Sequence, residues 1–159
     1  MVNLFRALEF LGLSVWLGSD IFLSFVVAPG AFRVLAPNRD QAGAVVGFAL
    51  TKMHLIGIAC GVAVLLLRLL RTKSLGSVAA PAGLCLMLMI TLTAVSQLTI
   101  TPKMAALRTQ MGSIQATSAN SPLLAEFARL HSISVTLESG VLLGGIACIY
   151  LMVRELDPH

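Results

Sequence analysis

The stretch from Leu130 to Arg154, LHSISVTLESGVLLGGIACIYLMVR, decides the fold of this chain. From residue 133 to residue 153 it contains 21 residues with a single charge, Glu138. A helix crosses the hydrocarbon core of a bilayer in about 20 mostly apolar residues, so this stretch predicts a membrane-spanning helix. An ionisable residue inside such a span costs about 3 kcal/mol or more, so Glu138 should face the protein interior and have a partner there.

The composition of the whole chain is that of a membrane protein. Of its 159 residues 57% are hydrophobic and only 11% are charged, whereas soluble domains have about 25% charged residues. The net charge of +4 is spread over loop positions, without the runs of Lys and Arg that bind nucleic acid. The sequence therefore predicts one domain, residues 1–159, that meets the lipid bilayer and has no nucleic-acid partner.

Three other apolar runs precede this stretch, and together they predict an all-α, integral membrane four-helix bundle. The spans should cover about residues 4–28, 48–70, 81–101 and 132–153. We expect the first helix to stop at Pro29 and the third to stop at Pro102, because proline is a typical helix-ending signal. Residues 103–111 then have the pattern of a short interfacial helix.

The second and fourth helical patterns are longer than a membrane is thick. Residues 40–71 and 122–154 are unbroken, which corresponds to about 48 Å and about 50 Å of helix against a hydrocarbon core of about 30 Å. Helices 2 and 4 should therefore extend beyond the bilayer on one side. The residues expected to line the resulting cap are apolar: Val45, Phe48, Leu123, Phe127 and Leu130.

The basic residues give a weak signal for orientation. Those on the side of the termini lie in short tails and one short loop: Arg6, Arg68, Arg71, Lys73 and Arg154. Charges close to span ends weigh most in the positive-inside rule, which favours both termini in the cytoplasm. The expected location is the inner (cell) membrane of a bacterium. At the start of the first span, Arg6 and Glu9 are three residues apart and should pair with each other.

Residue counting places four polar side chains at one depth. Measured from the side of the termini, Asp20 and His54 are 14 residues into their helices, while Gln97 and Glu138 are 16 residues in. At 1.5 Å per residue all four lie about 21–24 Å along the bundle. We call these four residues the polar layer.

Two interpretations of the polar layer remain open from the sequence. In the first, Asp20 and Glu138 supply carboxylates and His54 accepts a proton or binds a ligand, so the layer binds a cation, relays a proton or lines a substrate path. In the second, the four residues only satisfy one another and fix the register of the helices.

Histidine ligands for a metal or a haem are a third hypothesis. His54 and His131 are candidate ligands, but their heights differ by about 13 Å, which disfavours a haem between them. The metal and the cofactor, if there are any, are unknown. The three cysteines lie in apolar runs without metal-site spacing, and no arrangement of nucleophile and base is present, so we expect no enzyme.

Three segments of the chain resemble the transmembrane protein 205-like family, small four-span membrane proteins otherwise described as a domain of unknown function. They are WLGSDIFLSFVVAPGAFRVLAPNRDQAGAVVG (16–47), ITPKMAALR (100–108) and FARLHSISVTLE (127–138). The positions that match the family pattern are Pro29, Phe32, Ala42, Gly43, Pro102, Met104, Arg108, Leu130 and His131. Ser132 departs from it. The resemblance implies a four-span fold and a link of eukaryotic relatives to drug resistance, and it implies no catalytic residues.

These observations lead to three functional hypotheses. The first is a transport- or efflux-related membrane protein that acts through the polar layer. The second is a non-catalytic accessory subunit of a larger membrane complex, with a membrane-protein partner or a second copy of this chain. The third is a redox or pigment-binding protein that uses His54 or His131.

Overall fold

The computed structural model describes residues 2–156, and these form four long helices. Helix 1 consists of α1 (Val2–Phe22), the π-helical turn η1 (Leu23–Val27) and α2 (Ala28–Val34). Helix 2 is α3 (Arg39–Thr72), and the one-turn helix α4 (Gly76–Ala79) follows it. Helix 3 consists of α5 (Pro81–Val95), the π-helical turn η2 (Ser96–Ile100) and α6 (Thr101–Met111), and helix 4 is α7 (Pro122–Arg154).

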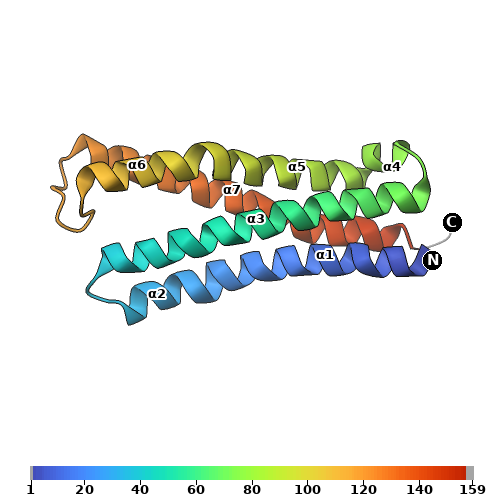
Figure 1. The fold of residues 1–159 in the computed structure, drawn as a ribbon, viewed down its shortest axis with the longest axis horizontal. Coiled ribbons are helices and arrows are strands. Elements are labelled where there is room, and N and C mark those ends of the chain that lie inside the picture. The colour runs from blue at the N-terminus through green and yellow to red at the C-terminus, as the bar shows by residue number, and fades with distance from the viewer. Residues whose placement is uncertain (1, 157–159) are drawn as a thin grey trace.

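The four helices run alternately up and down and confirm the predicted all-α bundle. Each is long and apolar enough to cross a membrane, and each predicted span falls inside one of them. Both ends of the described chain and α4 lie at one end of the rod, and the loops at residues 35–38 and 112–121 lie at the other end (Figure 1).

The predicted helix ends at Pro29 and Pro102 are wrong, because in both places the helix continues. Each proline comes two residues after a π-helical turn, at the start of the following α-helix. In these turns the N–H of Ala28 donates to the Leu23 carbonyl, and the N–H of Thr101 donates to the Ser96 carbonyl. The wider turn gives room for the proline ring and absorbs the missing N–H, so the helix passes the proline without breaking.

Helices 2 and 4 have the predicted length, and helices 1 and 3 are as long. With their proline-containing segments included, all four helices are of similar length, from 31 to 34 residues. The expected apolar cap is not closed, since Phe48 is 67% exposed and Val45 is 45% exposed, whereas Leu130 is buried. Neither α2 nor α6 has a buried residue.

The core lies towards the termini. We call residues 2–22, 54–95 and 138–156 the terminal half and residues 23–53 and 96–137 the distal half. Towards the distal end the α2–α3 pair diverges from the α6–α7 pair (Figure 1). All members of the buried apolar cluster lie in the terminal half: Leu13, Trp16, Val64, Ala82, Leu86, Met89, Val141, Cys148 and Met152.

Glycines on α3 make room for the largest side chain of this core. A Cβ at Gly57 would lie 2.2 Å from Nε1 of Trp16, and one at Gly61 would lie 2.6 Å from the far edge of the same ring. The indole therefore packs flat against the helix backbone, as small residues allow between membrane helices. On the distal part of the same helix, Gly47 has no atom within 4 Å of such a Cβ.

Candidate functional site: a polar layer between the two halves

The polar layer lies where the packed terminal half meets the distal half, with one residue from each long helix. Asp20 is on α1, His54 on α3, Gln97 in the turn η2 and Glu138 on α7. Asp20 and His54 are completely buried, with exposed fractions of 1% and 0%. Gln97 and Glu138 are half-buried.

His54 is the centre of the layer, because both of its ring nitrogens are hydrogen-bonded. Its Nδ1 lies 2.9 Å from Oε1 of Gln97, and its Nε2 lies 2.5 Å from Oε1 of Glu138. An amide oxygen only accepts, so Nδ1 is the protonated donor in the first contact. The second contact then contains exactly one proton, either on Nε2 beside a carboxylate or on Glu138 beside a neutral imidazole.

Asp20 belongs to the same level but makes no hydrogen bond to the other three residues. The hydroxyl of Ser24, one turn along α1, donates to its Oδ1 at 3.3 Å. Asp20 is nevertheless close enough to His54 and Glu138 to interact with them electrostatically. A buried carboxyl group, a half-buried carboxyl group and a buried imidazole therefore lie near one another.

Several polar atoms around the layer have no hydrogen-bond partner among the residues that the structure describes. They are Oδ2 of Asp20, Oε2 of Glu138, Oγ1 of Thr93 and Nε1 of Trp16. Buried polar atoms are nearly always satisfied in proteins, and each exception needs an explanation such as a bound water, an ion or a functional role. The unpaired carboxylate oxygens can accept a proton or contact a small cation or water.

The two π-helical turns lie at the level of the layer. Gln97 and Ser96 are in η2, and the Ser96 hydroxyl lies 3.5 Å from Oε1 of Glu138. Asp20 comes three residues before η1, and Leu23 within that turn is buried. Such turns occur frequently at functional sites, because they change the direction in which side chains point without ending the helix.

The layer is less covered on its distal side than on its terminal side. Towards the termini, Leu13, Trp16 and Val64 are at most 1% exposed and fill the bundle. In the other direction fewer side chains are buried, Leu130 and Ser134 on α7 among them at 3% and 6% exposed. Gly47, two turns from His54 on the same face of α3, meets no neighbouring atom.

His131 does not join the layer. It is exposed on α7, seven residues before Glu138, which is about 10 Å of helix. Both nitrogens of His54 are engaged by protein atoms, so the two histidines do not form a pair of axial haem ligands. No group of three or more His, Cys, Asp or Glu side chains suited to a metal ion occurs among residues 2–156.

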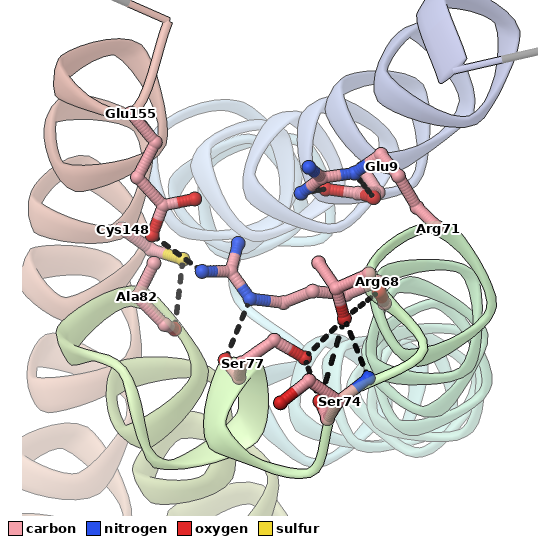
Figure 2. Close-up of polar contacts among 9 residues, drawn as sticks. Glu9, Arg68, Arg71, Ser74, Ser77, Ala82, Cys148 and Glu155 are labelled. Carbon is pink, nitrogen blue, oxygen red and sulfur yellow. Dashed lines mark hydrogen bonds and ion pairs between the residues drawn. The ribbon is translucent and has the colours of Figure 1, made fainter.

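A second polar cluster, at the terminal end, was missed by the sequence analysis (Figure 2). Glu9 does not pair with Arg6 as predicted; instead it accepts two hydrogen bonds from Arg71, at 2.7 and 3.1 Å. Arg68 donates to Glu155 at the C-terminal end of α7. These contacts join residues 62 and 87 positions apart, and local spacing along one helix could not identify them.

Comparisons with known proteins identify a family but no individual relative. No curated protein and no solved structure matches the chain. A family model described as "Domain of unknown function (DUF4149)" matches residues 11–113, which is more than half of the chain and includes Asp20, His54 and Gln97. Two of the three segments that suggested a family of small four-span membrane proteins, 16–47 and 100–108, lie inside the matched region. The chain is therefore a membrane protein with four candidate spans, and it belongs to the DUF4149 family.

Proposed function

We propose that this protein is a membrane transport protein whose polar layer binds and releases a proton. The observation that supports the proposal most directly is the contact of His54 Nε2 with Glu138 Oε1 at 2.5 Å, beside unpaired carboxylate oxygens on Asp20 and Glu138. One proton lies in that contact, and the unpaired oxygen of the neighbouring Asp20 is a second place that can accept it.

The energetic argument concerns the cost of ionisable groups inside a membrane. Three such groups are expensive to place there, and in membrane proteins they typically mark proton relays or ion paths. A network that only fixed the register of helices would be expected to satisfy its own atoms, as hydrogen-bonded layers do. Here both carboxyl groups keep one oxygen without a partner among the described residues.

The helix geometry supports movement at the same level. Helix 1 and helix 3 each contain a π-helical turn and a proline next to the layer. Helix 2, which is α3, and helix 4, which is α7, are continuous. Interrupted helices that surround a polar site are typical of transporters, because the two parts of such a helix can change their relative angle. The role that we propose is binding and transfer, without covalent catalysis.

The first experiment measures proton movement into liposomes that contain the purified protein and a pH-sensitive dye. Under an imposed membrane potential, we expect uptake by the wild type and at least a tenfold slower uptake by Glu138→Gln and Asp20→Asn. Glu126→Gln is the matched control, since Glu126 is exposed and pairs only with Arg129 on its own helix. Uptake equal to that of empty liposomes, or unchanged in Glu138→Gln, contradicts the proposal.

A second measurement follows the proton itself. Infrared spectra of the protein over a pH series should contain a carboxylic-acid C=O band that titrates and that disappears in Glu138→Gln or Asp20→Asn. Glu126→Gln should leave this band unchanged. If neither carboxyl group changes its protonation state, the layer does not bind and release a proton.

The location that we propose is the bacterial inner membrane with both termini in the cytoplasm. The support is the group of Arg and Lys residues in the short segments next to the terminal ends of the helices. A reporter enzyme fused to the C-terminus, active only in the cytoplasm, should be active; an equally active fusion of a periplasm-specific reporter would reverse this orientation.

A second candidate function is an accessory subunit of a membrane complex. One observation favours it, namely that α3 in the distal half presents Phe48, 67% exposed. A partner helix would find an aromatic anchor there. Mild detergent extraction of the tagged protein should then yield a stoichiometric partner, and a lone monomer would contradict it.

A further inference from the structure

The terminal end of the bundle contains four charged residues that meet inside the protein, and we call them the terminal cluster: Glu9, Arg68, Arg71 and Glu155. They come from α1, from α3 and from the end of α7. Glu9 and Arg68 are almost fully buried, with exposed fractions of 1% and 2%. Figure 2 shows Arg68 extending from α3 towards Glu155 on α7, with Glu9 and Arg71 beside it.

The contacts of the cluster connect α1, α3, α4 and the end of α7. Arg71 forms a two-point contact with Glu9 and so ties α3 to α1. Arg68 Nη2 donates to Glu155, which ties α3 to α7, and its Nε donates to the carbonyl of Ser77 in α4 at 2.8 Å. Opening this end of the bundle therefore requires that these ion pairs separate.

Ion pairs are a costly way to hold helices together if permanent closure is the only purpose. Burying two charges costs about as much as their attraction returns, so well-packed apolar side chains would serve a static contact equally well. At the end of a membrane protein the same charges are readily hydrated once they separate. Two Arg and two Glu residues would then meet water without a change in net charge, so the contact can form and break.

The terminal cluster lies on one side of the polar layer only. On the terminal side the layer is covered first by the apolar core around Trp16 and then by the terminal cluster. On the distal side, α2 and α6 contain no buried residue, although α3 and α7 bury Ala42 and Leu130. In this arrangement the terminal side of the layer is the more tightly closed one.

We infer that the terminal cluster is a gate: it closes the terminal side of the polar layer, and it must open for the layer to exchange with that side. The inference depends on the proposed function, because a gate has a purpose only if the layer exchanges with both sides. The structure then corresponds to a state in which the terminal side of the layer is closed.

The test uses thiol labelling in vesicles, with Cys60, Cys85 and Cys148 replaced by serine. A reporter at Thr93→Cys lies next to the layer and is 1% exposed, and a reporter at Gly47→Cys lies on the open distal side. A membrane-impermeant maleimide is added to either side. With the cluster intact, we expect Gly47→Cys to react only from the distal side and Thr93→Cys to remain unreactive from the terminal side.

Removal of an ion pair from the terminal cluster should change only the terminal-side labelling of Thr93→Cys. Glu9→Gln should raise terminal-side labelling of Thr93→Cys at least tenfold, and the charge exchange Glu9→Arg with Arg71→Glu should restore the low rate. Glu126→Gln is the control for loss of an exposed ion pair. Unchanged terminal-side labelling in Glu9→Gln, or no restoration by the exchanged pair, overturns the gate.

A second variant covers the case in which Glu9→Gln does not fold. Glu9→Cys with Arg71→Cys, joined by a bis-methanethiosulfonate cross-linker that spans the length of the lost ion pair, should lock the gate and abolish proton uptake, and reduction should restore uptake; uptake that continues while the pair is cross-linked overturns the gate. The labelling experiment does not depend on proton binding, so the transport proposal and the gate proposal can be refuted independently. If the labelling pattern is as predicted but no proton uptake is found, the transport function is refuted, whereas closure of the terminal side by the cluster is not.

Discussion

The terminal and distal halves of this protein are built from the same four helices, yet they are held together in different ways. In the terminal half, large side chains lie against glycines and the ion pairs of the terminal cluster close the end. In the distal half, contact between the helix pairs is concentrated at the tip. The comparison indicates that the helices are packed together at the terminal end and joined by polar contacts at the distal end. The polar layer lies between these two ends.

The distal tie depends on one carboxylate and one guanidinium. Asp40 accepts hydrogen bonds from the hydroxyl of Ser113 at 2.5 Å and from the N–H of Ile114 at 2.9 Å. Arg108 lies against Gly43, where a Cβ would be 3.0 Å from its Nη2, and 5.7 Å from the ring centre of Phe127. These contacts join loops and helix ends. Between them and the polar layer only a few apolar side chains are buried: Leu23, Ala42, Met53, Ile100 and Leu130.

The largest expected difference between the halves comes from removing an aromatic ring. Trp16→Ala removes the largest buried side chain and should cost about 3–5 kcal/mol of stability through the cavity that it leaves. Phe48→Ala, on the exposed side of the distal half, should change stability by less than about 0.5 kcal/mol. Thermal unfolding in detergent measures both, and equal losses would contradict the division into two halves.

A smaller effect is expected from adding one methyl group to a glycine of α3. Gly57→Ala forces a Cβ into the ring of Trp16 and should destabilise the protein by about 1–3 kcal/mol. Gly47→Ala meets no neighbouring atom and should be neutral or stabilising by up to about 1 kcal/mol, since alanine favours a helix. The melting temperature of Gly57→Ala should fall, while that of Gly47→Ala should stay level or rise; a loss at Gly47 would show that its face is packed.

The smallest effect on global stability should come from cutting the distal tie. Asp40→Ala leaves the Ser113 hydroxyl and the Ile114 N–H at the loop surface, where water replaces the carboxylate, so we expect a loss of about 1 kcal/mol or less. Limited proteolysis should nevertheless cut the loop at residues 112–121 faster. Glu126→Gln is the control, and an unchanged cutting rate in Asp40→Ala would show that this carboxylate does not hold the loop.

Much of the fold could be predicted from the sequence, because the length and hydropathy of a span are local properties. The helix ends at Pro29 and Pro102 could not, because a proline signals a break only if the preceding turn is an α-turn. Nothing in the residue types of LSFVV or SQLTI distinguishes a π-helical turn from a regular one. The extension of all four helices was missed for the same reason.

Only part of the candidate site could be predicted from the sequence. Counting residues from the charged ends groups His54, Gln97 and Glu138 at one level, because the rise per residue is fixed and the helices are antiparallel. Counting says nothing about rotation between helices, so neither the two partners of His54 nor the separation of Asp20 from them could be derived. The partner of Glu9 was assigned to the nearest basic residue, whereas the true partner is on another helix.

Each π-helical turn also takes up one residue without changing the direction in which the following segment faces. It contains one residue more than a regular turn, so a single deletion within residues 23–27 or 96–100 would leave a regular turn and nearly the same orientation downstream. The same deletion within residues 103–107, where the turns are regular, would rotate Arg108 by about 100° away from Gly43. These two pentapeptides are therefore the places where helices 1 and 3 tolerate a change of one residue in length.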